Sequence, residues 1–365
     1  MRLFRVVLGF LLSLAFISVI SGCGGGGGGK GSGTTYSYFT YVAYGKSIAI
    51  YSMNNATGEL TASGSFTTPD DTYPQSLVVH PTKPYLYVGC ANSSSKKIRV
   101  LRIAPTTGSL SEVQSIDSDS YTDIEITPNG KYLFTAGSGN QTSSFSVADD
   151  GKLTKCYNSA GSLVHIKVAP DSQTLYATIN LQVSGSGDIR ELATYAIGID
   201  GSLTKNASFS FTSIPVWITT TGQFIYVDVD GTLYQFNGGS TLQPNGTQKF
   251  SAGYFGKMVT VNGFLYTVKG VNTNPTTYYI AGFKISPTDG SLTEFTGNGY
   301  PYPTGTNSAI SCITTDPNKK FLYATDEKNK VILGFIASNG TLTQLSSSPS
   351  VSGAPVAIAT AKLSK

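Results

Sequence analysis

Charged residues are scarce in this chain of 365 residues: Asp, Glu, Lys and Arg together make up 13% of it, and the net charge is +4. The Lys and Arg residues are scattered, with Lys96-Lys97 and Lys319-Lys320 as the densest pairs. Proteins that bind nucleic acid gather basic residues on a face that follows the phosphates. Because no such stripe is present, nucleic acid is a poor candidate partner.

Cysteine and histidine are rarer still, with four and two copies. No C-x-x-C pair and no Cys/His spacing typical of zinc occurs, so we expect no metal site and no cofactor. Besides Cys23 the chain has Cys90, Cys156 and Cys312, which fall in three different copies of the repeat described below. We predict that all three are small buried residues, although an oxidising compartment would permit one disulfide.

Sustained helical periodicity is also absent, and a short β-type pattern takes its place. An apolar strand, a turn with Pro or Gly, a Leu-Tyr pair and a later Gly-x-Leu recur in order. The Leu-Tyr pair or a close relative occurs at Thr40-Tyr41, Leu86-Tyr87, Leu133-Phe134, Leu175-Tyr176, Ile225-Tyr226, Leu265-Tyr266 and Leu322-Tyr323. The Gly-x-Leu element begins at Gly58, Gly108, Gly151, Gly201, Gly290 and Gly340, with a looser copy from Gly239 to Leu242. The period of about 40–57 residues is close to that of four-stranded propeller blades. The pattern therefore predicts an all-β, seven-bladed β-propeller.

The two ends of the repeat region look like two parts of one blade. Pro355 to Ala359 resembles the first strand of a blade, whereas Tyr38–Ala43, Ser47–Met53 and Leu60–Phe66 resemble a blade without its first strand. Pairing the two ends would close the ring and remove free sheet edges, which otherwise invite aggregation. We therefore expect residues 36–365 to form a single propeller domain.

The first 35 residues have a different composition. Arg2 and Arg5 precede an apolar run from Val6 to Ile20, which is too short for a comfortable membrane span and is typical of a secretory signal peptide. The run ends in Ser21-Gly22-Cys23, which resembles the lipobox of bacterial lipoproteins, and a Gly-rich segment follows. We predict a signal peptide at residues 1–22, then a lipidated Cys23 and a flexible tether at residues 23–35. The alternative is a simple signal peptide with an incidental cysteine. Because Gly24 rather than Asp follows the cysteine, we expect a cell-envelope lipoprotein held by membrane lipid, in the outer membrane.

The repeat resembles the lactonase-type seven-bladed propellers, the family that includes 6-phosphogluconolactonase and the fungal muconate lactonising enzyme. The strand-Pro-x-x-x-x-Leu-Tyr and Gly-x-Leu-Thr units carry this resemblance over about residues 36–362. These units are structural, so they imply the fold more directly than the activity.

Family enzymes also carry Pro-Arg-His, with the His five residues before the turn Pro, and Asn-Glu after Leu-Tyr-x-x. His165 matches that His, five residues before Pro170, but Leu163-Val164 replace Pro-Arg. Glu327 falls at the Glu position, with Asp326 in place of Asn. His165 and Glu327 are thus the candidate catalytic residues, and the missing Arg predicts that hydrolysis of sugar lactones is not retained. His80 precedes Pro81 at the opposite end of its strand, and we expect it to be structural.

A ligand site is expected at one mouth of the channel, where loops that enter the first strand of each blade meet loops that leave the second. Asp123 is the notable acid there, because it occupies the same strand position as His165. The further candidate binding residues are Tyr73, Tyr121, Arg190, Glu191, Tyr254 and Asp326. Aromatic rings with a few polar groups suit a small molecule. Three functions stay open: a binding or scaffold module, which the sequence favours; a hydrolase of lactones or related small carbohydrates; and an adhesion or envelope-assembly component that binds an envelope protein.

Overall fold

The computed structural model describes residues 34–137, 141–161, 163–182, 187–249, 254–271, 277–297, 302–304 and 308–365. Thr35–Lys365 forms one compact unit. The predicted signal peptide, Cys23 and all but the last two residues of the predicted tether lie outside the described residues. The helical part of the described chain is a single 3-10 turn, η1 (Pro69–Asp71), and no described helix is long and apolar enough to cross a membrane.

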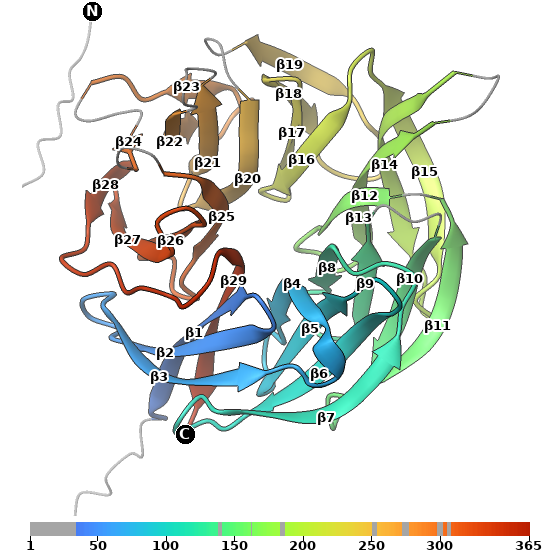
Figure 1. Ribbon diagram of the computed structural model, residues 1–365. Helices are drawn as coiled ribbons and strands as arrows, with labels where there is room; N and C mark the ends of the chain where they lie inside the picture. The colour runs from blue at the N-terminus through green and yellow to red at the C-terminus, as the bar shows by residue number, and fades with distance from the viewer. Residues whose placement is uncertain are drawn as a thin grey trace, which may run out of the picture. The chain divides into compact units, whose positions relative to one another are not determined.

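Seven antiparallel sheets surround a central channel, and each runs outward from it as one blade (Figure 1). Blade 1 contains β4 (Tyr73–Val79), β5 (Tyr85–Ala91), β6 (Lys96–Ile103) and β7 (Leu110–Asp117). Blade 2 contains β8 (Asp123–Ile126), β9 (Tyr132–Ala136), β10 (Gln141–Val147) and β11 (Leu153–Ala160). Blade 3 contains β12 (Leu163–Val168), β13 (Thr174–Leu181), β14 (Ile189–Ile197) and β15 (Leu203–Ser210). Blade 4 contains β16 (Pro215–Thr220), β17 (Phe224–Val229), β18 (Thr232–Asn237) and β19 (Pro244–Lys249).

The remaining three blades complete the ring. Blade 5 contains β20 (Tyr254–Val261), β21 (Phe264–Val271), β22 (Thr277–Ile285), β23 (Leu292–Glu294) and β24 (Tyr302–Pro303), the last two both paired with β22. Blade 6 contains β25 (Ile310–Thr315), β26 (Phe321–Asp326), β27 (Val331–Ser338) and β28 (Thr341–Gln344). Blade 7 contains β29 (Pro355–Ser364), β1 (Tyr36–Tyr44), β2 (Ser47–Met53) and β3 (Leu60–Thr67). The predicted seven-bladed architecture is confirmed.

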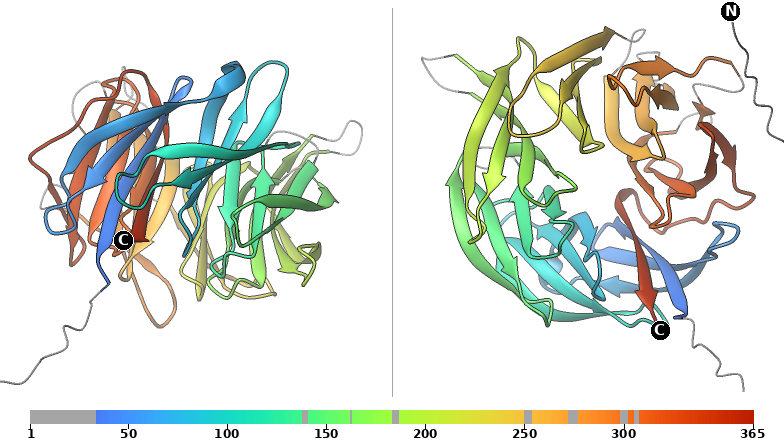
Figure 2. Two further views of the ribbon diagram at one scale, coloured as in Figure 1. Left: turned by 90° about the horizontal axis from the view of Figure 1, so that it is seen from below. Right: turned by 180° about the vertical axis from the view of Figure 1, so that it is seen from behind.

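The predicted closure is confirmed by blade 7, in which the last strand of the chain lies beside the first (Figures 1 and 2). β29 pairs antiparallel with β1 from Tyr36↔Ser364 to Ala43↔Ala357. The backbone N–H of Lys365 also donates to the carbonyl of Thr35 at 2.9 Å. The ring is therefore held shut by backbone hydrogen bonds between segments more than 300 residues apart in the sequence.

The repeated Leu-Tyr and Gly-x-Leu elements meet between blades. The Tyr hydroxyl on the second strand of one blade donates to the Gly carbonyl in the turn before the outermost strand of the next blade. The pairs are Tyr41 with Gly108 at 3.0 Å, Tyr87 with Gly151 at 3.0 Å, Tyr226 with Gly290 at 2.7 Å and Tyr323 with Gly58 at 2.7 Å. The glycine is required twice over: Gly58 has φ +79°, and a Cβ there would lie 2.5 Å from the ring of Phe321. The repeat is thus a set of contacts that hold neighbouring blades together.

Replacing Tyr323 by Phe should lower the free energy of unfolding by about 1–3 kcal/mol, because the buried carbonyl of Gly58 loses its donor. The ring itself fits this position, since blade 2 already carries Phe134 there. Urea unfolding followed by circular dichroism measures the loss. Tyr36→Phe, at an exposed tyrosine, is the matched control. Equal stability of the two variants would contradict this role of the hydroxyl.

The cysteine prediction is correct for two residues and wrong for one. Cys90 and Cys312 are buried, whereas Cys156 is exposed. The reason is its position: Cys156 lies on β11, the outermost strand of blade 2, where its neighbours Lys155 and Tyr157 are also exposed. All three cysteines are free thiols, so none of them forms a disulfide.

Candidate functional site

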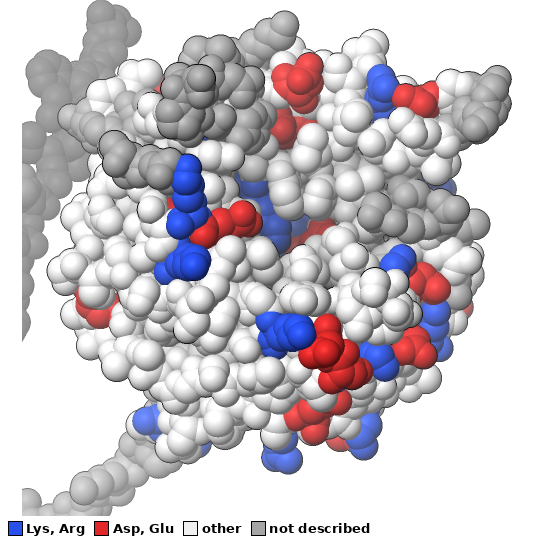
Figure 3. Space-filling view, in the orientation of Figure 1, with Lys and Arg blue, Asp and Glu red and all other residues white. Residues whose placement is uncertain are grey.

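The candidate site is a cavity of about 320 Å³ in the central channel, lined by the first strand of every blade. Figure 3 shows a hollow at the centre of one face, with acidic and basic side chains in and around it. Side chains alternate along a strand, so every second residue of each inner strand borders the cavity at a comparable height. We call the first cavity-lining residue of each inner strand the first channel level. These residues are Ser76, Asp123, His165, Trp217, Lys257, Cys312 and Ala357. Two residues further along each strand lies the second level, which includes Val78, Glu125, Lys167, Val259, Thr314 and Ala359.

Asp123 and His165 form the acid–imidazole pair of the first level. The Nδ1 atom of His165 lies 3.4 Å from Oδ2 of Asp123, and each side chain is only 16% exposed. The same carboxylate oxygen accepts the N–H of Ile166 at 2.9 Å, which fixes its orientation. Burial opposes ionisation of Asp123, but the His165 imidazole, the charge of Lys257 and the Ile166 N–H outweigh it and lower the pKa of this carboxyl. Asp123 is therefore an anion that can orient and stabilise a protonated imidazole.

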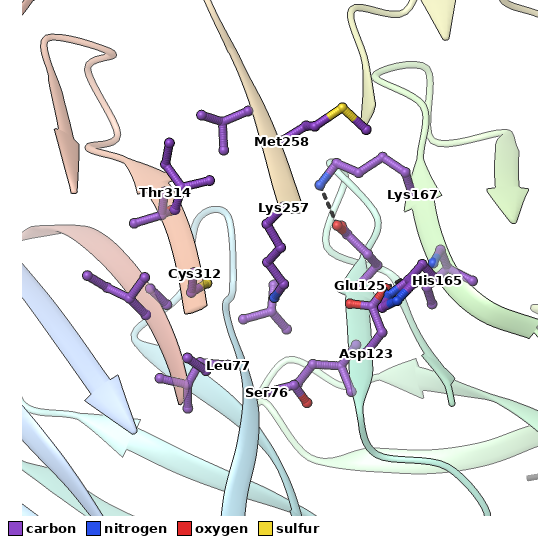
Figure 4. Close-up of a pocket in the computed structure, with 18 of the residues that line it drawn as sticks. Ser76, Leu77, Asp123, Glu125, His165, Lys167, Lys257, Met258, Cys312 and Thr314 are labelled. Carbon is purple, nitrogen blue, oxygen red and sulfur yellow. Dashed lines mark hydrogen bonds and ion pairs between the residues drawn. The ribbon is translucent and has the colours of Figure 1, made fainter. Parts of the chain in front are cut away.

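The polar contacts continue around the first level through two further blades. The His165 ring packs against the Trp217 indole, with centroids 3.9 Å apart. The ammonium of Lys257 lies 5.5 Å from the centroid of the same indole. Figure 4 shows Lys257 reaching into the cavity between Cys312 on one side and Asp123 on the other. Cys312, Asp123 and Glu125 together outweigh burial and raise the pKa of Lys257, with Cys312 as the largest influence.

The second channel level adds one ion pair, between Lys167 and Glu125. Lys167 donates to Glu125, an interaction marked by the dashed line in Figure 4. Burial, which outweighs the attraction of Lys167, raises the pKa of Glu125. With Glu125 paired to Lys167 and Asp123 paired to His165, Lys257 is the channel cation without an ion pair among the described residues. The cavity therefore offers one positive charge to an anion or to a developing negative charge.

Small side chains account for the open space. Ser76 and Ala357 occupy the first level where the other blades carry larger groups, and Val78 and Ala359 lie below them. Ser76 Oγ donates to the carbonyl of Tyr121 at 2.5 Å, so its hydroxyl is committed to the next blade. One arc of the channel is thus filled with functional groups, and the facing arc leaves room for a small molecule.

Of the residues singled out from the sequence, the structure brings Asp123 and His165 together in the cavity. Arg190 and Glu191 lie instead on β14, a third strand, where Arg190 bonds Asp188 and the Thr212 carbonyl and Glu191 pairs with Lys205. Tyr73 and Tyr121 do not line the cavity, and they lie near Lys46 and Lys96 respectively. Tyr254 begins β20, but its side chain lies outside the described residues.

Asp326 and Glu327 leave β26 near the channel without lining the main cavity. Asp326 Oδ1 accepts the N–H groups of Ala309, Lys328 and Asn329 at 3.0–3.1 Å, which ties the carboxylate to the turn. Glu327 lines a separate pocket of about 350 Å³, and that pocket shares Trp217 with the main cavity. Burial first, and then the charge of Asp326, raises the pKa of Glu327. Glu327 therefore does not line the cavity that holds His165.

His80 has the structural setting that the sequence predicted. It is 3% exposed, and its Nδ1 accepts the N–H groups of Thr82 and Lys83 at 3.1 and 3.0 Å. Burial lowers the pKa of His80 to about 4, so the ring stays neutral and serves as an acceptor for the turn.

Sequence reasoning missed Lys257, Trp217, Cys312 and the Glu125–Lys167 pair. A signal for the first level was present, because Ser76, Asp123, His165 and Cys312 each precede the turn Pro by five residues. The same count from Gly222 and Asn262, in the turns of blades 4 and 5, leads to Trp217 and Lys257. Val164 brings no charge, but Lys257, from a different blade, lines the cavity and brings a positive charge to it. In the described part of the chain, no group of three or more His, Cys, Asp or Glu side chains is placed to hold a metal.

Comparison with known proteins agrees with this architecture. Residues 45–162 match the family described as "Lactonase, 7-bladed beta-propeller". A 6-phosphogluconolactonase of Pectobacterium carotovorum is 24% identical over 173 residues, which are 41% of this chain and 51% of the relative. A 6-phosphogluconolactonase of Cronobacter sakazakii is 26% identical over 161 residues, 40% of this chain and 45% of the relative. The match therefore spans about half the length of these relatives.

A solved structure extends the likeness to the whole propeller. The periplasmic gluconolactonase of Pseudomonas aeruginosa superimposes with a TM-score of 0.71, covering 89% of this chain and 99% of that one. Its identity of 17% makes this a likeness of fold. Together with the closed ring of seven blades, these findings show a seven-bladed β-propeller that is similar to the lactonase-type propellers.

Proposed function

We propose that this propeller hydrolyses lactones of small carbohydrates in its central channel. The observation that carries the proposal is the Asp123–His165 pair, whose atoms lie 3.4 Å apart at a cavity that also holds the Lys257 ammonium. Hydrolysis of a ring ester needs a base for water and a positive charge for the oxygen that becomes anionic. The channel holds both on one level.

The residues would divide the work as follows. His165 takes a proton from the water that attacks the acyl carbon, and Asp123 stabilises the imidazolium that forms. Lys257 stabilises the negative charge on the carbonyl oxygen in the tetrahedral state. The bond between the acyl carbon and the ring oxygen then breaks, and the ring oxygen receives the proton from His165. The product is the open hydroxy acid.

The substrate class rests on the comparisons. The sequence relatives are named 6-phosphogluconolactonase and the structural neighbour gluconolactonase, so we propose sugar lactones for this chain as well. The same matches favour a hydrolase over the binding or scaffold module that the sequence alone favoured. That earlier preference rested on the missing Arg, and Lys257 supplies a charge in its place.

A panel of five- and six-membered sugar lactones, with and without a phosphate group, tests the proposal. Release of acid is followed by a pH indicator, against the spontaneous rate of each lactone in the same buffer. We expect turnover above that rate for at least one lactone. A purified protein that accelerates none of them is not a lactonase of this class.

We propose further that the protein is an envelope lipoprotein anchored through Cys23. The proposal rests on Ser21-Gly22-Cys23 directly after the apolar run and on the Gly-rich segment that follows. Cys23→Ser should leave the protein as an uncleaved precursor or release it from the membrane fraction, because the acyl chains that anchor it are not attached. Fractionation and intact mass measure both effects, with Cys156→Ser as the control. Wild-type protein without a lipid mass on Cys23 would refute the anchor.

A further inference from the structure

A cysteine forms part of the channel wall and takes no part in the mechanism described so far. Cys312 lies on β25 at the first channel level, is 2% exposed and lines the cavity (Figure 4). Its thiol is free, as are those of Cys90 on blade 1 and Cys156 on blade 2. Cys312 therefore combines a free sulfur with direct access to the space where a ligand would lie.

Lys257 lies beside Cys312 at the cavity. The two residues come from neighbouring blades, both line the cavity, and Figure 4 shows the Lys257 side chain between Cys312 and Asp123. A nearby ammonium stabilises the thiolate, which is the nucleophilic form of cysteine. Cys90, the other buried cysteine, differs in place: it does not line the cavity, and burial raises the pKa of its thiol to about 12.

The position of Cys312 within the first level also suits a nucleophile. In blade order it stands between Lys257 and Ala357, where the arc of functional groups ends and the open arc begins. A small molecule in the open arc would thus meet the sulfur directly. It would meet His165 and Asp123 across the cavity, on the other side of Lys257 (Figure 4).

We propose that Cys312, paired with Lys257, is a covalent nucleophile of the channel that takes the acyl group of a ring ester as a thioester. The proposal rests on the proposed function but changes its route: the thiolate replaces water in the first attack, and Lys257 rather than His165 protonates the ring oxygen. The Cys312 thiolate attacks the carbonyl carbon and a C–S bond forms. The bond between that carbon and the ring oxygen breaks, and the leaving alkoxide takes a proton from the Lys257 ammonium.

The second half of the reaction restores the thiolate. Water, deprotonated by His165, attacks the thioester carbon, and the C–S bond breaks with its electrons returning to sulfur. The imidazolium of His165 then returns its proton to Lys257 through solvent. The sum is one lactone and one water converted to one hydroxy acid, and no oxidant or reductant is needed.

Intact-mass spectrometry after an acid quench tests the intermediate. Ring opening by a thiol adds every atom of the lactone, so the full-length protein should gain the complete lactone mass, and peptide mapping should place it on Cys312. Cys90 and Cys156 in the same sample are the internal controls. Cys312→Ala should abolish the adduct and lower kcat at least about 100-fold. Cys312→Ser is a second variant in case the first does not fold, and the melting temperature of each is recorded.

The outcomes separate this proposal from the proposed function. Lactone turnover that survives Cys312→Ala, with or without an adduct in the wild type, overturns the nucleophile and leaves the hydrolase standing. If no lactone is turned over, the hydrolase fails and alkylation decides about the thiol. Iodoacetate should then label Cys312 faster than iodoacetamide does, relative to Cys156, and Lys257→Gln should remove that preference. Equal labelling by the two reagents would overturn the nucleophile by itself.

Discussion

Removal of residues 355–365 should abolish folding of the propeller. These residues form β29, which pairs with β1 along its whole length and buries Ala357, Ile358, Ala359, Ala361 and Leu363. The strand also bonds blade 6, where Ser311 Oγ donates to the Pro355 carbonyl at 2.8 Å and Thr360 Oγ1 donates to the Thr315 carbonyl at 2.7 Å. The free energy of unfolding of a domain is only about 5–15 kcal/mol. Removing a buried strand takes away most of that stabilisation. The deletion also exposes an edge of β1 beside the channel, and exposed edges aggregate.

A circular permutant is the matched control for the deletion. Its chain would begin at Pro355, run through Lys365 and a short linker to Thr35, and end at Ala354. Because the N–H of Lys365 already bonds the Thr35 carbonyl at 2.9 Å, a tight hairpin can join these ends. Circular dichroism and size-exclusion chromatography should show a folded monomer-sized permutant and an aggregated or unfolded deletion variant. A deletion variant that melts at the wild-type temperature would refute the closure of blade 7.

Replacing Lys257 by Gln should lower kcat on a lactone substrate by about 10²–10³, the usual loss when one stabilising group of an oxyanion site is removed. Lys257 is the channel cation without an ion pair in the described part, so no neighbour takes over its charge. His165→Ala and Asp123→Asn should each cause a loss of similar or greater size. The matched control is Lys155→Gln, which breaks an exposed ion pair with Asp119 on blade 2 and should leave kcat within about twofold.

The pH profile adds an independent check on these roles. The pKa of Asp123 is lowered from 3.8, so its carboxylate stays ionised above that pH. The pKa of Lys257 is raised from 10.5, so its ammonium stays protonated below that pH. Neither group titrates between these limits, so kcat should not change between them through loss of the Asp123 charge or of the Lys257 charge. A fall in kcat between these limits that Lys257→Gln removes would contradict the protonated lysine.

The blade repeat could be read from the sequence because each part of it follows from local geometry. A Pro marks the turn after the first strand, period-two alternation marks the half-buried strands, and Asp-Gly or Asn-Gly marks the last hairpin. The reason why Tyr and Gly recur from blade to blade could not be inferred in the same way, because they bond across different blades. Tyr323 and Gly58 are 265 residues apart, and only the closed ring brings the hydroxyl to the carbonyl.

Part of the candidate site could likewise be predicted from the sequence, and the rest required the tertiary structure. The sequence by itself determined that His165 and Asp123 occupy equivalent positions on two inner strands, because both precede a turn Pro by five residues. It also determined that Val164 cannot supply the charge that the resembling family places there. Only the tertiary structure decided that Lys257 brings a positive charge to the cavity, that Cys312 lies beside it, and that Arg190 and Glu191 do not line the cavity. The physical reason is that one residue of each blade reaches each level of the channel, so the site is assembled from strands that are distant in sequence and adjacent only around the ring.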